Sequence, residues 1–78
     1  MTERHLNLKV TCGKDYEEVR FTIKASTPLI KLFQKYCDRN NLNIRSVNFI
    51  YNGIKINDED TPLALGMEND DEINCIVL

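Results

Sequence analysis

With 78 residues, the chain has room for one small hydrophobic core, and we expect a single domain over residues 1–78. No apolar run approaches the roughly 18 residues of a membrane span, and a formal net charge of −2 gives no reason to expect nucleic acid as a partner. The N-terminal residues lack the apolar stretch of a secretory signal, so we do not expect export.

Charge is distributed unevenly along the chain. Seven of the 12 acidic residues lie between positions 58 and 72. Five of the ten basic residues lie between positions 20 and 39: Arg20, Lys24, Lys31, Lys35 and Arg39. We therefore expect the folded molecule to have a basic side and an acidic side.

The N-terminal third predicts a β-hairpin. Every second residue is apolar over residues 5–12 and again over residues 19–24, which is typical of half-buried strands. Gly13 and Asp15 supply turn residues between the two segments. The first strand should bury Leu6, Leu8, Val10 and Cys12, and the second should bury Val19, Phe21 and Ile23.

The middle of the chain predicts one amphipathic helix. Ser26 and Thr27 precede Pro28, an order typical of a helix start with a hydroxyl cap. Apolar residues then recur at spacings of three and four up to an end near Asn40-Asn41. This stripe, which should face a sheet, consists of Leu29, Leu32, Phe33, Tyr36 and Cys37.

Shorter elements follow the helix. A third strand is expected over residues 45–51, and Asn52-Gly53 is the dipeptide typical of a tight type I′ turn into a short strand over residues 54–56. Thr61-Pro62 predicts a capped single helical turn. An apolar strand over residues 73–78 ends the chain.

This order of elements predicts an α+β fold. The sheet should be mixed and have four to five strands, with the main helix packed across one face and the short helical turn beside it. The second strand is expected at an edge of the sheet.

The residues offer little for catalysis. His5, the single histidine, has no orienting partner that the sequence identifies. The three cysteines form an odd set without a Cys-x-x-Cys pair, which indicates a reducing nucleus or cytosol and neither disulfides nor zinc. Cys12, Cys37 and Cys75 fall in phase with apolar positions, so we expect them in the core. We expect no enzyme, no metal and no cofactor, which leaves surface recognition.

Several ordered motifs resemble the SUMO (small ubiquitin-like modifier) family of the ubiquitin-like superfamily. The resemblance extends over about His5 to Cys75 and implies the β-grasp fold. The motifs that carry it are Tyr36-Cys37-Asp38-Arg39, Ile56 to Pro62, and Leu65-Gly66-Met67-Glu68.

The resemblance also implies two binding surfaces. A groove between the second strand and the helix would accept SUMO-interacting motifs, because an edge strand can pair with an extended peptide. The groove residues carried over are Val19, Arg20, Phe21, Thr22, Ile23, Lys24, Lys31, Leu32, Lys35 and Arg39. The alternative is that these apolar residues only fill the core and the basic ones only keep the helix solvated. The surface for the conjugating enzyme would comprise Glu68, Asp70 and Asp71.

The chain departs from the family pattern at several positions. Thr22 stands where a basic residue is common, Asn52 stands where an acidic one is common, and Ile30 and Phe33 occupy helix positions that are usually more polar. The departures at Thr22, Ile30 and Phe33 could alter partner preference or expose an apolar patch.

The C-terminus is the largest departure, because Leu78 is not followed by the Gly-Gly tail of a conjugatable SUMO. Either the sequence is trimmed to its ordered core, which we favour, or the natural protein is a SUMO-like domain that binds without being conjugated. The implied partners are the SUMO activating, conjugating and ligating enzymes, proteins with SUMO-interacting motifs and, with a tail, covalent protein substrates. A monomer in nucleus and cytoplasm is expected, without nucleic acid or membrane.

Overall fold

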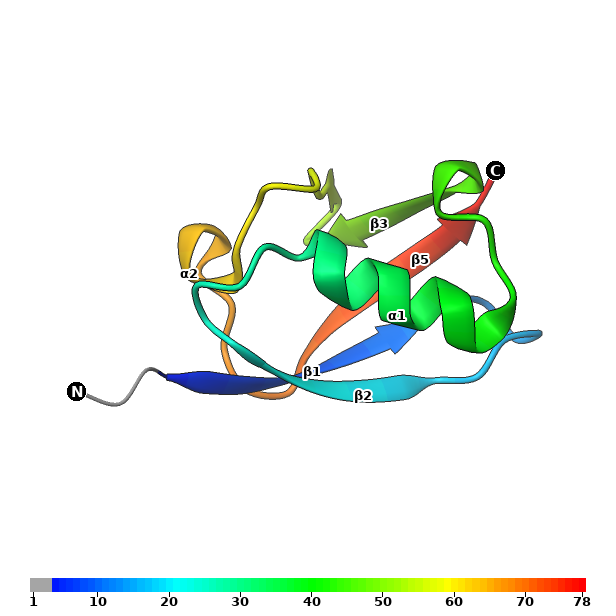
Figure 1. The fold of residues 1–78 in the computed structure, drawn as a ribbon. Helices are drawn as coiled ribbons and strands as arrows, with labels where there is room; N and C mark the ends of the chain where they lie inside the picture. Colours follow the sequence, from blue (N-terminus) through cyan, green and yellow to red (C-terminus); the bar gives the residue numbers. More distant parts are fainter. Residues whose placement is uncertain (1–3) are drawn as a thin grey trace.

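The five strands form one mixed sheet with the main helix packed across one face. The structure, a computed structural model, describes residues 4–78 (Figure 1). The predicted α+β architecture is confirmed. In chain order, the elements are β1 (His5–Thr11), β2 (Val19–Lys24), α1 (Ile30–Asn40), the 3₁₀ turn η1 (Ile44–Ser46), β3 (Val47–Tyr51), β4 (Ile54–Lys55), α2 (Pro62–Leu65) and β5 (Asp71–Val77).

The sheet has the order β2-β1-β5-β3-β4. β1 and β5 run parallel, whereas the β1–β2, β3–β5 and β3–β4 pairs are antiparallel. β2 lies at an edge, as predicted, and within residues 4–78 its only strand partner is β1. Its outer backbone groups are therefore not used by the sheet.

The start of α1 differs from the prediction. The helix begins at Ile30, its N-cap is Leu29, and no side chain caps it. Backbone carbonyls of the loop over residues 58–60 replace the expected hydroxyl, because Asp60 O accepts from Leu29 N at 2.8 Å and Asp58 O from Ile30 N at 3.2 Å. The predicted end is confirmed, since α1 ends at Asn40 and the next residue, Asn41, is the left-handed C-cap with a φ of 56°.

The third strand begins at Val47, two residues later than predicted. The Asn43 side chain accepts a hydrogen bond from Arg45 N at 2.9 Å and starts a 3₁₀ turn in place of the strand. The predicted turn is confirmed, because Asn52 and Gly53 have the positive φ values of 51° and 78° that a type I′ turn requires.

The remaining elements agree with the prediction except at their ends. Thr61 Oγ1 accepts from Ala64 N at 3.1 Å and caps α2, as expected. β5 begins two residues early, at Asp71, which pairs with Leu8 of β1. β4 stops at Lys55, one residue before the predicted end.

Three aromatic rings join α1 to the sheet. Phe33 stacks on Phe49 with ring centroids 3.9 Å apart and planes 2° apart, and Tyr36 meets Phe49 edge to face at 6.2 Å. Phe33 is only 2% exposed, so it belongs to the core and adds no apolar patch to the surface. Burial raises the pKa of Tyr36 to about 12, and its hydroxyl donates to Glu17 O at 3.0 Å.

Candidate functional site

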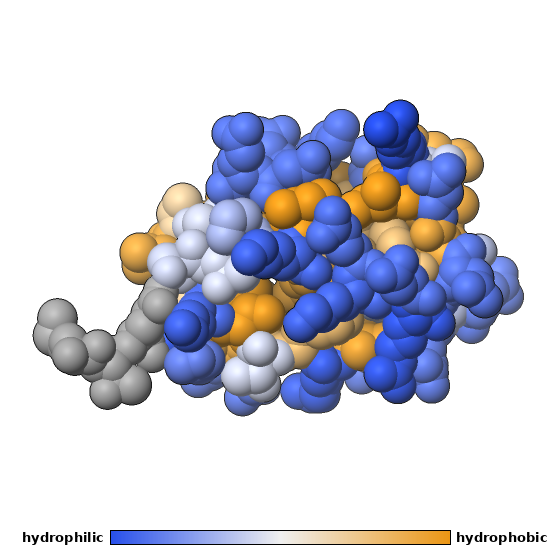
Figure 2. All heavy atoms as spheres, in the orientation of Figure 1, coloured by the Kyte–Doolittle hydropathy of each residue, from blue (hydrophilic) through white to orange (hydrophobic). Residues whose placement is uncertain are grey.

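A hollow of about 400 Å³ runs between the open edge of β2 and the exposed side of α1. We call it the β2 groove. In Figure 2, apolar atoms are visible below α1 among polar side chains. The residues that line it are His5, Phe21, Thr22, Ile23, Lys24, Thr27, Lys31, Leu32 and Lys35.

The floor of the β2 groove is apolar. Phe21 and Ile23 alternate toward α1 and are half-buried, while Leu32 is 1% exposed beneath them. The Phe21 ring contacts Tyr36 edge to face, with centroids 6.5 Å apart. The partial exposure of Phe21 and Ile23 leaves apolar surface that an inserted side chain can cover.

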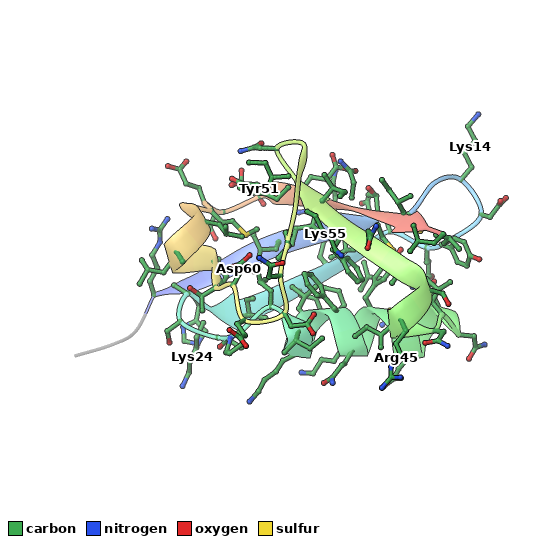
Figure 3. The ribbon with its side chains drawn as sticks, turned by 90° about the horizontal axis from the view of Figure 1, so that it is seen from above. Lys14, Lys24, Arg45, Tyr51, Lys55 and Asp60 are labelled. Carbon is green, nitrogen blue, oxygen red and sulfur yellow. The ribbon has the colours of Figure 1, made fainter. Side chains whose placement is uncertain are left out.

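Three lysines border the β2 groove, and none of them forms an ion pair within residues 4–78. Lys31 and Lys35 lie one helical turn apart on α1. Lys24 ends β2 and extends away from the sheet (Figure 3). Their uncompensated positive charge favours an anionic occupant.

Three residues predicted for the groove lie outside this hollow. Arg20 alternates to the sheet face opposite α1, where its Nη1 is 3.4 Å from Asp70 Oδ1. Arg39 pairs with Glu17 at 3.4 Å near the other end of the helix. Val19 is 8% exposed and packs in the core.

Two residues that line the hollow were not predicted. His5 stands directly opposite Lys24 in the β1–β2 ladder, and Thr27 lies in the turn before α1. The hairpin register would have identified His5. The long connection between the strands hides that register, because no two-residue turn sets the pairing.

The predicted acidic surface lies in the turn before β5. Asp70 has a φ of 69° and pairs with Arg20, and Glu68 is exposed. Asp71 differs from both, because its Oδ2 accepts from Tyr51 Oη at 2.7 Å and from Glu68 N at 2.8 Å. Glu68 and Asp70 are therefore the members of this set whose carboxylates are best placed to contact another protein.

Asp71 makes stability depend on pH. The Glu68 backbone N–H, followed by the Tyr51 hydroxyl, holds the pKa of this carboxyl below its usual value. A lowered folded-state pKa stabilises the fold above the usual carboxyl range, and this contribution is lost as pH falls through the lowered value. We expect Asp71→Asn to lower the free energy of unfolding by about 1 kcal/mol at pH 7. Below about pH 4, the free energy of unfolding should fall less steeply in this variant than in the unmodified protein, as measured by urea unfolding.

Glu68→Gln is the matched control for this change. The Glu68 carboxylate forms no hydrogen bond or ion pair within residues 4–78, so its neutralisation should leave the acid response in place. An equal flattening of the pH profile in both variants would refute the role of Asp71.

The cysteines do not form a reactive site. Cys12, Cys37 and Cys75 are buried free thiols, as predicted, and burial raises the pKa of Cys37 and of Cys75. A protonated buried thiol is a poor nucleophile. In the described part of the chain, no group of three or more His, Cys, Asp or Glu side chains is arranged to hold a metal ion, and no helix has the length and apolarity to cross a membrane.

The element order and the helix across a mixed sheet define a ubiquitin-like β-grasp protein. Among solved structures, an ubiquitin of Caldiarchaeum subterraneum superposes with a TM-score of 0.88 over 96% of this chain and 95% of that one, at 17% identity. A structure described as "Molecular Mimicry of SUMO promotes DNA repair" superposes with a TM-score of 0.82 over 99% of this chain and 96% of that one, at 14% identity.

Sequence comparison identifies the family. Residues 6–77 match the family described as "Ubiquitin-2 like Rad60 SUMO-like", and the chain belongs to it. Small ubiquitin-related modifier 3 of Xenopus tropicalis is 49% identical over 70 residues, which cover 90% of this chain and 73% of the relative. Small ubiquitin-related modifier 2 of Homo sapiens is 47% identical over the same shares. The predicted SUMO-type identity is confirmed.

Proposed function

We propose that this chain is a SUMO-type protein modifier. With a diglycine tail it is joined to substrate lysines, and the chemistry belongs to the activating, conjugating and ligating enzymes rather than to the modifier. Its own part is to present surfaces, chiefly the β2 groove, to proteins that carry SUMO-interacting motifs. It works as a monomer in nucleus and cytoplasm, compartments whose reducing conditions suit three buried free thiols.

The open edge of β2 beside an apolar hollow is the observation that carries this proposal. An extended peptide can pair with β2 through main-chain hydrogen bonds while its aliphatic side chains cover Phe21 and Ile23. Lys31 and Lys35 then meet an acidic flank, each contributing at most about 1 kcal/mol because both are exposed.

An NMR titration tests this function. The probe is acetyl-Val-Ile-Val-Val-Asp-Glu-Glu-amide, and its control carries three lysines in place of the acidic flank. We expect saturable shifts of the amides from Phe21 to Lys24 with the acidic probe and much weaker ones with the control. Shifts confined to other parts of the molecule would refute the β2 groove as the recognition site.

A second candidate is a SUMO-like domain that binds the SUMO conjugating enzyme noncovalently and is never conjugated. The description of the family and the two available carboxylates in the turn before β5 favour it. The gene sequence after the codon for Leu78 separates the candidates, since only the modifier requires a diglycine.

Binding to the SUMO conjugating enzyme provides the test of the acidic turn. We expect Glu68→Arg to weaken calorimetric binding several-fold through charge reversal, while the β2 groove titration stays unchanged. Glu68 suits this test better than Asp71, whose carboxylate stabilises the turn itself. Unaltered affinity in Glu68→Arg would argue against this surface.

A further inference from the structure

β3 has an open edge of its own. β4 pairs with β3 only at Ile50 and Tyr51, and the last bond between the two segments is from Ile56 N to Phe49 O at 2.8 Å. Beyond that bond the chain turns away toward α2. The first half of β3 is therefore uncovered on the side away from β5.

Strand alternation identifies the backbone groups at this edge. Leu78 N donates to Ser46 O, so Ser46, Asn48 and Ile50 direct their backbone groups toward β5. Val47 and Phe49 direct theirs to the other side. The N–H of Val47 lies at the end of the 3₁₀ turn η1, where the i→i+3 pattern directs it to the carbonyl of Ile44. Within residues 4–78, neither neighbouring strand supplies a partner for the C=O of Val47 or for the N–H of Phe49. Such groups require water or another chain.

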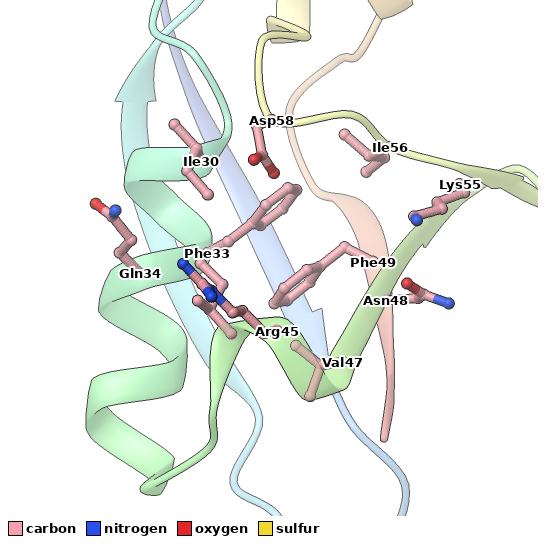
Figure 4. Close-up of a pocket in the computed structure, with 11 residues that line it drawn as sticks. Ile30, Phe33, Gln34, Arg45, Val47, Asn48, Phe49, Lys55, Ile56 and Asp58 are labelled. Atoms are coloured by element: carbon pink, nitrogen blue, oxygen red, sulfur yellow. The ribbon is translucent and has the colours of Figure 1, made fainter. Parts of the chain in front are cut away.

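A hollow of about 490 Å³ lies next to this edge, between β3 and α1. We call it the β3 groove. Phe33 and Phe49 form its apolar floor, and Ile30 and Ile56 stand near one end (Figure 4). Apolar atoms are also visible above α1 in Figure 2. The β3 groove lies on the opposite side of α1 from the β2 groove (Figure 1), so the two can be filled at once.

The charges at the rim of the β3 groove select its occupant. Arg45 and Lys55 are exposed, and neither forms an ion pair in the described residues 4–78. Asp58 is the one acidic residue that lines the hollow, and Figure 4 shows it at one end, between Ile30 and Ile56. Arg45 and Lys55 therefore leave uncompensated positive charge at the rim, which an occupant's carboxylate can balance.

We propose that the β3 groove binds a second extended peptide, which pairs with Val47 and Phe49, places an apolar side chain toward Phe33 and Ile30, and carries a carboxylate to Arg45 or Lys55. Two main-chain hydrogen bonds, to the C=O of Val47 and from the N–H of Phe49, become available at the edge. The protein is then able to hold two peptide segments on the two sides of one helix. This binding does not depend on occupation of the β2 groove.

An NMR titration with acetyl-Glu-Val-Thr-Val-Glu-amide tests the proposal, with the peptide carrying lysines at both ends as its control. The acidic probe should give saturable shifts at the amides of Val47, Asn48 and Phe49. Arg45→Glu should weaken this response about fivefold, whereas Lys35→Glu should weaken only responses in the β2 groove. Shifts restricted to β2, or a β3 response insensitive to Arg45→Glu, would overturn the β3 groove and leave the β2 groove intact.

Hydrogen exchange checks the open edge itself. The amide of Phe49 should exchange faster than those of Asn48 and Ile50 in the same strand, and the acidic probe should slow it. Equal protection of these three amides in the free protein would overturn the proposal, because it would mean that the edge is already paired.

Discussion

Replacing Phe33 with alanine is expected to destabilise the protein by about 3–5 kcal/mol, the usual cost of removing a buried phenylalanine ring. Phe33 is 2% exposed and stacks on Phe49 at 3.9 Å, so its removal leaves a cavity between helix and sheet. Small domains have a total stability of about 5–15 kcal/mol, so this loss is a large fraction of it. Urea unfolding followed by circular dichroism measures the change.

Ile30→Ala is the matched control, because Ile30 lies one turn earlier on α1 and is only partly buried. Ile30→Ala should lower the free energy of unfolding clearly less than Phe33→Ala does. Phe33→Leu should retain most of the stability that Phe33→Ala loses. Similar losses for Ile30→Ala and Phe33→Ala would contradict the central place of the Phe33–Phe49 stack.

Phe33 also shows which sequence signals were dependable. Its spacing from Leu29 and Tyr36 placed it on the apolar stripe of the helix, and the structure confirms this burial. The comparison with more polar family members suggested an exposed apolar residue instead. Periodicity was the better guide, because a helix buries whichever side faces the sheet.

The elements that the sequence predicted depend on local residues. Strand alternation, the Asn52-Gly53 turn and the Thr61 cap each need only a few neighbouring positions. The start of α1 needed more, since its first N–H groups bond to carbonyls of the loop over residues 58–60. A cap supplied by a distant backbone has no signature in the residues beside the helix.

The geometry of the candidate site was predictable to the same extent as the fold. The element order placed β2 at an edge, and the alternation of Phe21 and Ile23 directed them toward α1. The roles of the basic residues were not predictable, because Arg20 and Arg39 pair with carboxylates whose proximity only the fold creates. The edge of β3 was hidden for a similar reason, since it depends on how early β4 ends.

The double variant Lys31→Glu/Lys35→Glu reverses both helix charges and is expected to weaken the binding of a peptide with an acidic flank about tenfold or more. Both lysines line the β2 groove without ion-pair partners in residues 4–78, so each contributes up to about 1 kcal/mol of attraction, which reversal turns into repulsion. Because the attraction is screened by salt, the loss should shrink between 50 mM and 500 mM salt. Calorimetry with acetyl-Val-Ile-Val-Val-Asp-Glu-Glu-amide at the two salt concentrations measures both effects.

Arg20→Glu is the control that separates the β2 groove from general charge. It changes a basic residue of the same strand, but Arg20 faces the opposite side of the sheet and pairs with Asp70. The lysine-flanked peptide provides the reciprocal experiment. The double variant should bind this peptide more tightly than the unmodified protein does. If Arg20→Glu weakened the binding of the acidic peptide as much as the double variant did, net charge would explain binding, and the two lysines of α1 would have no specific role.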